Sequence, residues 1–274
     1  IINLKETELK LANDIYSSET DIKNNRDNLI EVNKNINTIE NNLLNIRRNK
    51  EEIIKELDLN SRKEKELTYK IELLRESIDN NSNLSYGVRS VLNNPKLTSI
   101  HGVIGKLIEM EEKYVTAIDV SLGASKEFVV VDNEKNAKDA INYLKNNNLG
   151  RATFFPLSVI SPKGIDEDTL DKINNHISFI GIAANLVKYD PKYRNIILNQ
   201  LGNVIIADNI DGANDISRLI NHRYKIVTLD GELIHVGGSM TGGSIKKTGS
   251  MIKEKYELED MLRQVTLVTN ECKN

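Results

Sequence analysis

The first 84 residues contain neither glycine nor proline, the two residues that most readily interrupt a helix. A heptad with position a at Ile15 places apolar side chains at eight of ten a positions and seven of ten d positions. The a positions hold Ile15, Ile22, Leu29, Ile36, Leu43, Lys50, Leu57, Glu64, Ile71 and Ile78, and the d positions hold Leu11, Ser18, Asn25, Val32, Ile39, Ile46, Ile53, Asn60, Leu67 and Leu74. Because so narrow and long a stripe is buried only against another helix, residues 1–84 are predicted to form a coiled-coil arm.

The end of the chain carries a shorter pattern of the same kind. Residues 250–274 also contain neither glycine nor proline. Heptad spacing relates Met251, Leu258, Leu262, Val265, Thr269 and Cys272. The two patterns predict an antiparallel pair of helices, because the chain leaves along one helix and returns along the other. The returning helix is expected to place Leu258, Leu262 and Val265 against the stripe near Ile78, Leu74 and Ile71. The first 55 to 60 residues or so then lack a partner in this chain, and we expect them to be bent, frayed or paired with another molecule.

Between these helices the pattern becomes that of a globular domain, and Gly87 and Pro95 mark the change. Apolar runs predict strands at 101–104, 127–131, 152–155, 203–207, 225–229 and 232–236. Amphipathic spacing predicts helices at 111–122, 134–146, 191–200 and 211–221. The sequence therefore predicts a mixed α/β (α+β) domain inserted between the two helices of an antiparallel coiled coil.

Two stretches of the middle domain resemble each other. Each contains Leu-Gly, then an apolar strand that ends in Asp, then an Ala that opens a helix. The matched pairs are Leu122–Gly123 with Leu201–Gly202, Asp132 with Asp208, Ala137 with Ala213, and Leu144 with Ile220. An internal duplication explains this correspondence and predicts two similar subdomains, with a boundary near Gly150.

No arrangement of residues predicts catalysis. The stretch 241–248 has Thr241 and Lys246 where a phosphate-binding loop requires glycines. The four histidines, His101, His176, His222 and His235, lack the spacing of metal ligands and are interpreted as ordinary surface or strand residues. Asp132 and Asp208 are expected to be helix N-caps. Cys272 is the single cysteine, so neither an internal disulfide nor a cysteine zinc site can form within one chain. We therefore expect a non-enzymatic fragment without a cofactor.

The segment 234–244 is rich in glycine and follows a predicted strand. Gly237, Gly238, Gly242 and Gly243 permit positive φ angles or a close approach of another backbone. Two interpretations are open from the residues alone. The segment is either a flexible tether to the returning helix or a bare strand edge on which a second subunit docks.

The same segment resembles the glycine motif of the hinge of SMC (structural maintenance of chromosomes) ATPases. Further stretches resemble the bacterial form of this hinge: YGVRSVL (86–92), HGVIGKLI (101–108), YVTAIDVSLG (114–123), GRATFFPL (150–157) and VTLDGELI (227–234). The resemblance covers nearly the whole middle domain and is flanked by heptads. It implies a coiled-coil arm at 1–84, hinge subdomain I at 85–150, hinge subdomain II with the glycine segment at 151–249, and a returning helix at 250–274.

The resemblance also implies a function. Bacterial SMC hinges pair into a ring-like homodimer, with the glycine segment at the contact, so Gly237, Gly238, Gly242 and Gly243 are expected at a dimer interface. ATP and magnesium are expected at a head domain outside this fragment, where non-SMC subunits bridge two heads. The implied setting is chromosome condensation and segregation in the cytoplasm, at the nucleoid. No apolar run reaches the roughly 20 residues that a membrane span needs, so no membrane partner is expected.

Two other functions stay open. A basic group at the junction of hinge and coil could contact DNA phosphates without reading sequence, and the candidates are Arg89, Lys246, Lys247, Lys253 and Lys255. The net charge of −3 gives no overall attraction to DNA, so any such contact must be local. A small nucleotide-binding α/β enzyme domain on a stalk is the third possibility, and the missing phosphate loop argues against it.

Overall fold

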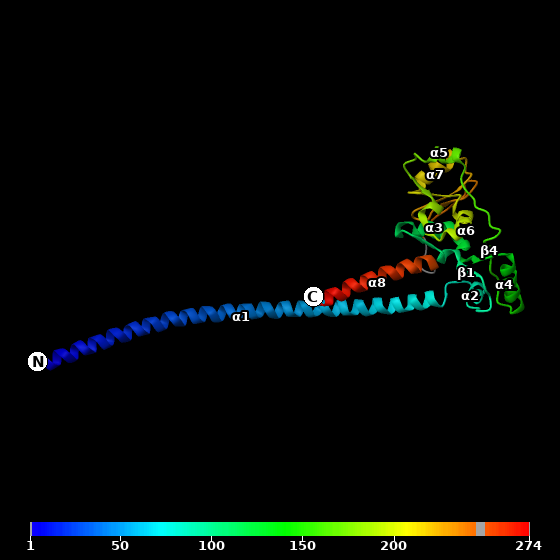
Figure 1. Ribbon diagram of the computed structural model, residues 1–274. Coiled ribbons are helices and arrows are strands. Elements are labelled where there is room, and N and C mark those ends of the chain that lie inside the picture. Colours follow the sequence, from blue (N-terminus) through cyan, green and yellow to red (C-terminus); the bar gives the residue numbers. More distant parts are fainter. Residues whose placement is uncertain (1, 245–249, 274) are drawn as a thin grey trace. The chain divides into compact units, whose positions relative to one another are not determined.

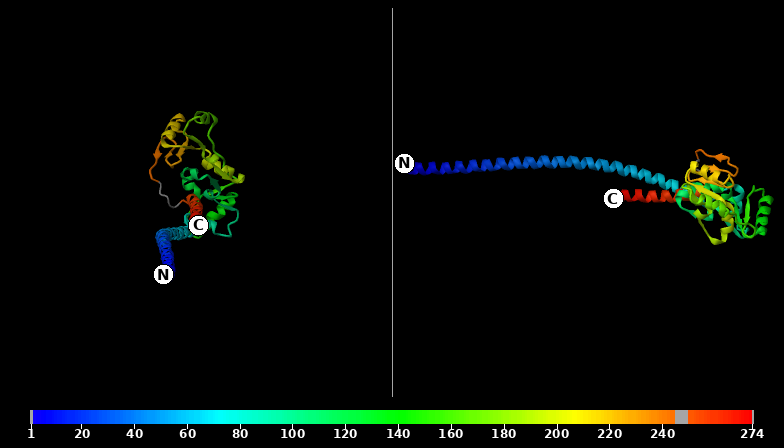
Figure 2. Two further views of the ribbon diagram at one scale, coloured as in Figure 1. Left: turned by 90° about the vertical axis from the view of Figure 1, so that its left-hand side faces the viewer. Right: turned by 90° about the horizontal axis from the view of Figure 1, so that it is seen from above.

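The computed structural model describes the backbone of residues 2–244 and 250–273, with side chains from residue 6 onward (Figures 1 and 2). The chain divides into two compact units, one of residues 1–65 with 267–274 and one of residues 66–266. Helices α1 (Ile2–Asp79) and α8 (Met251–Lys273) contribute residues to both units. Among the described residues, no helix has both the length and the hydropathy that crossing a bilayer requires.

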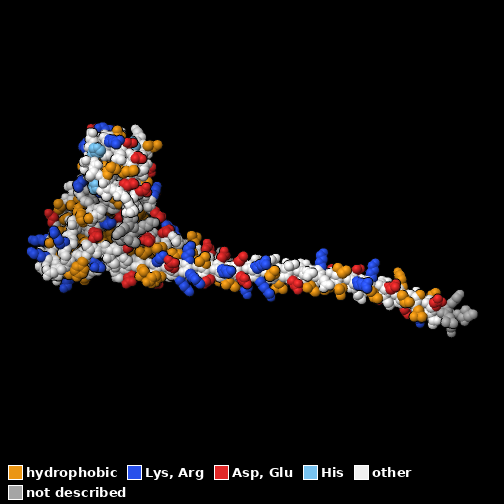
Figure 3. Space-filling model, turned by 180° about the vertical axis from the view of Figure 1, so that it is seen from behind, with side chains coloured by type: hydrophobic (Ala, Val, Ile, Leu, Met, Phe, Trp, Pro, Cys, Tyr) orange, Lys and Arg blue, Asp and Glu red, His pale blue; other side chains and the backbone are white. Residues whose placement is uncertain are grey.

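In the first unit, α1 is helical throughout and its heptad stripe lies exposed. Ile15 is 57% exposed, and Leu29 and Ile46 are exposed to a similar extent. Figure 3 shows apolar side chains spaced along this helix among charged ones. Near the end of the unit, the Thr269 hydroxyl of α8 donates to the Glu64 carboxylate at 2.6 Å. The predicted helix is confirmed. Of the three expectations for the first residues, bent, frayed or paired with another molecule, the described helix fits the first, because it is continuous and curves along its length (Figure 1). Pairing with another molecule stays a prediction.

In the second unit, the last turns of α1 and the first turns of α8 lie side by side and antiparallel (Figure 1). Leu67 and Ile71 of α1 are buried. The Ser77 hydroxyl donates to the Glu254 carboxylate at 3.3 Å. The predicted antiparallel pairing is thus confirmed, but its register is shifted by about one turn, because the end of α1 meets residue 254 rather than Leu258.

The buried side of α8 also differs from the prediction. Leu262 is exposed, whereas Met261 is half-buried and Val268 is buried. A heptad stripe can step by three then four residues or by four then three, and the sequence of this short helix fits both. The structure favours the first, because Met261 replaces Leu262 on the buried side and Val268 is buried, whereas Thr269 is half-buried.

The globular part of the second unit begins with a three-stranded sheet and its helices. In chain order its elements are α2 (Tyr86–Leu92), β1 (Ile100–Val103), η1 (Ile104–Lys106), β2 (Ile108–Met110), η2 (Glu112–Tyr114), α3 (Val115–Leu122), η3 (Gly123–Glu127), β3 (Val129–Val131), α4 (Glu134–Asn146) and β4 (Phe154–Pro156), where η marks a 3₁₀ helix. Strand β3 is central, antiparallel to β1 and parallel to β4. Strand β4 lies beyond residue 150 and still belongs to this first sheet.

A five-stranded sheet follows, in the order β10-β9-β8-β7-β5. Its elements are α5 (Glu167–Ile173), β5 (Phe179–Ile182), η4 (Ala183–Leu186), β6 (Val187–Tyr189), η5 (Pro191–Tyr193), α6 (Arg194–Leu201), β7 (Val204–Ala207), α7 (Ile210–Leu219), β8 (Lys225–Thr228), β9 (Leu233–Ile234) and β10 (Met240–Thr241). Only β7 and β8 are parallel; the other neighbours in this sheet are antiparallel.

The internal repeat predicted from the sequence recurs in the structure. We call residues 100–156 the first repeat and residues 179–228 the second. Both run strand, 3₁₀ turn, short strand, 3₁₀ turn, helix, strand, helix, strand, apart from the 3₁₀ helix η3, which follows the first helix of the first repeat and has no counterpart in the second. Both have an irregular register in their first strand. Lys113 lies 4.7 Å from the Tyr114 ring centre, and Lys192 lies 4.8 Å from that of Tyr193. The short strands β2 and β6 pair antiparallel and so join the two repeats.

The N-cap prediction for Asp132 and Asp208 is wrong by one residue. The caps are Asn133 and Asn209, whose side chains accept from the Asn136 and Gly212 backbone N–H groups. A cap side chain must reach an N–H two or three residues ahead, and α4 and α7 begin at residues 134 and 210.

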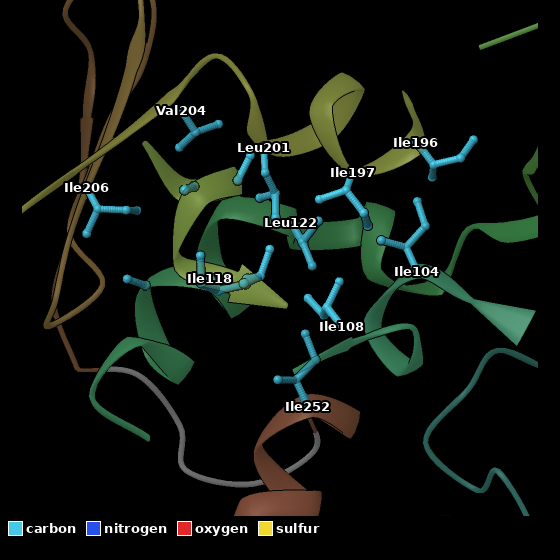
Figure 4. Close-up of a cluster of buried hydrophobic side chains, with 14 of the residues drawn as sticks. Ile104, Ile108, Ile118, Leu122, Ile196, Ile197, Leu201, Val204, Ile206 and Ile252 are labelled. Carbon is cyan, nitrogen blue, oxygen red and sulfur yellow. The ribbon is translucent and has the colours of Figure 1, made fainter. Parts of the chain in front are cut away.

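The largest apolar core lies where the two repeats meet, and Figure 4 shows it in detail. Ile118 and Leu122 of α3 face Ile197 and Leu201 of α6 (Figure 4). These four are equivalent positions of the two repeats, so the duplication builds a shared core from matching helices. Ile252 of α8 belongs to the same core and is 3% exposed. The returning helix is therefore part of the globular core from its first turn.

One carboxylate between the two repeats gives a pH-dependent prediction. Asp166 caps α5, and hydrogen bonds from the Thr169 and Tyr224 hydroxyls, in that order, lower its pKa from 3.8 to about 2. A lowered pKa stabilises the fold above pH 3.8, and this contribution is lost as the pH falls through about 2. In urea unfolding, Asp166→Asn should be less stable than the wild type at about pH 6, and this difference should close by about pH 2. Asp168→Asn, in the same turn, is the control. A difference that stays constant with pH would contradict the assignment.

Candidate interaction edges of the two sheets

The glycine segment forms the hairpin that connects β9 to β10. Gly237 and Gly238 have φ angles of 87° and 92°, a region that side chains with a Cβ atom rarely adopt. The Gly238 N–H donates to the His235 carbonyl at 2.9 Å, and the His235 N–H donates to the Ser239 carbonyl at 2.8 Å. These two glycines therefore make the turn of the hairpin and do not line a strand.

His222 holds this turn in place from the α7–β8 loop. The Gly237 N–H donates to the His222 carbonyl at 2.9 Å. A Cβ atom on Gly238 would lie 3.3 Å from Nδ1 of the His222 ring, so the ring packs directly against the turn. The Nδ1 atom also lies 2.7 Å from the Ser217 hydroxyl. Sequence reasoning missed this contact, because only the fold brings residue 222 beside residue 237.

The hairpin makes β10 the outer strand of the five-stranded sheet. Met240 and Thr241 pair with Ile234 and Leu233 on one side. On the other side, no strand in the described ranges 2–244 and 250–273 pairs with β10. Met240 is 52% exposed, and Val236, two residues after β9, is 65% exposed. The edge thus combines unpaired backbone groups with apolar side chains, a combination that favours docking of another strand.

Gly242 and Gly243 follow this edge strand directly. A Cβ atom on Gly243 would meet no described atom within 4 Å, and its φ is 118°. A Cβ atom on Gly242 would contact the Glu232 side chain at 3.4 Å. Among the described residues, packing inside one copy therefore requires neither glycine, and the surface beside β10 is open to another chain.

The first sheet has an outer edge at the equivalent place. In the second repeat, β9 covers the outer side of β8 through the pairs Ile226–Ile234 and Val227–Leu233. In the first repeat, β4 matches β8, and no described strand covers its outer side. The chain thus has an added hairpin on one sheet and, in its described part, a bare edge at the equivalent place on the other.

The candidate DNA-binding residues are only partly brought together. Lys246 and Lys247 lie outside the described residues. Lys255 donates to the Glu109 carboxylate at 3.3 Å, and Lys253 lines a separate hollow together with acidic residues, Glu112 among them. The structure therefore pairs or surrounds these two lysines with negative charge.

Arg89 lies on α2 and packs over the Tyr86 ring at 5.8 Å.

A cation that the sequence analysis did not select, Lys106, lines a hollow of about 240 Å³ with Lys255 and the apolar side chains of Ile108 and Ile252. Burial lowers the pKa of Lys106. The ammonium group of Lys106 already donates to Asn81 at 2.6 Å and to the Ile78 carbonyl at 3.3 Å, which ties η1 to the end of the α1 helix.

The histidines form no metal centre in the described part of the chain, where no three His, Cys, Asp or Glu side chains cluster. His101 has a structural role that its sequence context does not indicate. Its Nε2 atom lies 2.7 Å from the Asp132 carboxylate, and its Nδ1 atom lies 3.3 Å from the Tyr193 hydroxyl of the second repeat. The His101 contact lowers the pKa of Asp132. His101 therefore bridges the two repeats.

Comparison with known proteins gives one family. The family described as "SMC proteins Flexible Hinge Domain" matches residues 97–217. The chromosome partition protein Smc of Bacillus subtilis is 46% identical over 181 residues, which is 65% of this chain and 15% of that protein. The Clostridium kluyveri protein of the same name is 41% identical over 164 residues, 60% of this chain and 14% of that protein. The chain thus spans about 15% of the length of these relatives.

Solved structures agree with this assignment. A crystal structure described as an asymmetric dimer of the Geobacillus stearothermophilus SMC hinge domain is similar, with a TM-score of 0.75 and 36% identity, over 81% of this chain and 90% of that one. A Pyrococcus furiosus Smc hinge domain with an extended coiled coil has a TM-score of 0.51 and 28% identity, over 87% of this chain and 86% of that one. The second comparison includes a flanking coiled coil as well as the globular part.

Proposed function

The chain belongs to the family of SMC hinge domains, and from this premise we propose that it joins two identical SMC chains through the open edges of its two sheets. The observation that supports the proposal is the unequal ending of the two repeats. The second repeat carries an additional hairpin with an exposed outer strand, β10, whereas the equivalent edge at β4 is bare among the described strands. Strand addition would satisfy backbone groups on both edges at once.

Two-fold symmetry makes this arrangement close on itself. If β10 of one copy docks beside β4 of the other, the symmetry operation places the second β10 beside the first β4. Two contacts form for one association, and neither edge remains to recruit a third copy. The apolar side chains of Met240 and Val236 would be covered in the same step. The crystal structure of the Geobacillus relative is described as an asymmetric dimer, which supports the pairing of two copies but not its two-fold symmetry.

The wider role follows the relatives. We infer that the whole protein acts in chromosome partition, as the names of its bacterial relatives state. In the cytoplasm, at the nucleoid, head domains would bind ATP and magnesium, and non-SMC subunits would bridge them. The hinge itself is proposed to be non-enzymatic. DNA contact at the junction of hinge and coil stays a prediction, and the acidic neighbours of Lys253 and Lys255 do not favour it.

Site-specific crosslinking between two differently tagged copies tests the pairing. Both copies carry Cys272→Ser, one adds Thr241→Cys on β10, and the other adds Thr153→Cys beside β4. A short bis-maleimide should join the two cysteines and so link the two tagged copies, because strands docked side by side lie about 5 Å apart. The experiment uses the full chain, so that both repeats and the coil are present.

A matched control separates docking from simple exposure. Ile177→Cys replaces Thr153→Cys in the second copy; Ile177 is 98% exposed, but lies before β5, at the other side of its sheet. The proposal expects crosslinking to position 177 to be much weaker than crosslinking to position 153. Equal yields at both positions, or a monomer mass for the wild type by light scattering, would count against it.

A further inference from the structure

The returning helix α8 starts on a buried polar cluster. Ser250, immediately before α8, donates its hydroxyl to Oδ1 of Asp119 on α3. Lys126 of η3 donates to the same Oδ1 at 2.9 Å and lies 3.4 Å from the Ser250 hydroxyl. Asp119 is 8% exposed and Ser250 is 7% exposed. The three side chains thus close a small network between the first repeat and the residue that precedes the coil.

The internal repeat shows that the fold does not itself require a charge here. Aligning Leu122–Gly123 with Leu201–Gly202 makes Leu198 of α6 the equivalent of Asp119. The second repeat packs the same helix with an apolar side chain at this position, and α8 starts beside the first repeat instead. Burying an ion pair carries a desolvation cost that often offsets its attraction. A gain in stability therefore does not explain why the first repeat has Asp119 where the second has Leu198.

Neighbouring contacts hold the first turns of α8 to the same repeat. A Cβ atom on Gly105 of η1 would lie 2.6 Å from the Met251 side chain, so the helix start sits directly on this turn. The Tyr256 hydroxyl both accepts from the Met110 N–H and donates to the Met110 carbonyl, each at 2.9 Å. Ile252 fills the core between these contacts. Apolar packing thus supplies the attraction, but it is not directional.

We propose that Asp119, Lys126 and Ser250 form an anchor that fixes where the returning helix begins and which side of it faces the hinge. Hydrogen bonds are directional, so a closed network selects one position of Ser250 where apolar contacts alone would accept several. Asp119 is the positioning residue, because both partners bind one of its oxygens. The first repeat then sets the position of the returning helix, and the sheet edge of the second repeat has no part in it.

The test is hydrogen–deuterium exchange of the full chain carrying Asp119→Leu, the residue found at the equivalent position of the second repeat. The amides of residues 251–256 should exchange at least about ten times faster, because the helix start is no longer fixed. The melting temperature should also fall by several degrees, since Lys126 is left without its partner.

Two further variants separate positioning from stability. Asp119→Leu with Lys126→Met removes both charges, so the melting temperature should return to within about 2 °C of the wild type while fast exchange at 251–256 persists. Lys225→Met removes another half-buried cation that donates to the same helix, at the Ser121 carbonyl, 2.6 Å away. It should lower the melting temperature and leave exchange at 251–256 unchanged.

Three outcomes would overturn the proposal. One is wild-type exchange at 251–256 in Asp119→Leu. Another is recovery of both stability and protection in the double variant, which would show that Asp119 only neutralises the charge of Lys126. The third is equal loss of protection in Lys225→Met, which would trace the effect to a loosened α3. If Asp119→Leu fails to fold, the double variant decides the matter. Sedimentation of the wild type and the same variants measures dimerisation separately. A wild type that does not dimerise would contradict only the proposed function.

Discussion

Replacing Gly242 and Gly243 with tryptophan should leave a folded chain that sediments as a monomer, whereas the proposed dimer of the wild type should sediment at twice the 30.9 kDa of one chain. The reason lies in the space around the two glycines. Gly243 has no described atom within 4 Å of the position that a Cβ would take, and Gly242 meets only the Glu232 side chain among the described residues. Large side chains therefore fit beside one copy, at the cost of some strain from the φ of 118° at residue 243. They would occupy the space that a docking strand needs.

The expected size of this effect is large. A strand held away from its partner loses both its backbone hydrogen bonds and the covered apolar surface, and two-fold symmetry applies the loss twice. We expect the dissociation constant to rise at least about 100-fold, which corresponds to about 2.8 kcal/mol. Analytical ultracentrifugation over a concentration series measures it directly.

Gly164→Trp is the matched control for this experiment. Gly164 also has no described atom within 4 Å of an added Cβ, but it lies in the loop before α5 and not beside an outer strand. This variant should stay dimeric. Dimers of unchanged affinity in the Gly242 and Gly243 double variant would remove the glycines from the interface.

The second large effect is expected at Gly202, where alanine should lower the free energy of unfolding by about 2–4 kcal/mol. A Cβ atom there would lie 2.2 Å from the Lys163 carbonyl oxygen and 2.5 Å from that of Leu198. Both are backbone atoms, so they cannot turn aside as a side chain can. The φ of Gly202 is −70°, which shows that close approach, and not an unusual backbone angle, requires glycine here.

Its equivalent in the first repeat, Gly123, requires glycine for the opposite reason. No described atom lies within 4 Å of an added Cβ, but φ is 51° with ψ of −125°. Alanine at 123 should cost about 1–2 kcal/mol of strain, and leucine should cost about the same as alanine. At Gly202, leucine should cost clearly more than alanine. Urea unfolding of the four variants measures this, and a matching dependence on side-chain size at both glycines would contradict the explanation.

Sequence alone predicted the elements whose signals are long or strongly apolar. The heptads of α1, the four main helices and the strands around Val130, Ile206 and Val227 are confirmed within a few residues. Strands β2, β6 and β10 were missed, because two or three residues are too few to show alternation. The four-residue strand β5 was missed as well. The seven-residue helices α2 and α5 were missed for the same reason.

The site was less predictable than the fold. The glycine segment could be found by composition, but its division into a turn at 237–238 and an open surface at 242–243 depends on φ angles that only the folded hairpin sets. Asp119 gave no signal, because its partner Ser250 lies 131 residues away in the sequence. The position of Asp132 between a strand and a helix predicts a cap, and its actual partner, His101, lies 31 residues earlier in the sequence.

The place of Ile252 in the central core has a consequence for how the protein is made. Helix α1 is synthesised before the rest of this sequence, and the stretch from residue 80 to residue 252 follows before the core can be completed. At a synthesis rate of about 5–20 residues per second, this takes roughly 10 to 35 seconds. During that interval the nascent arm displays its row of isoleucines and leucines to the crowded interior of the cell. The last turns of a newly made α1 helix therefore face their greatest risk of pairing with a wrong helix before α8 has been synthesised.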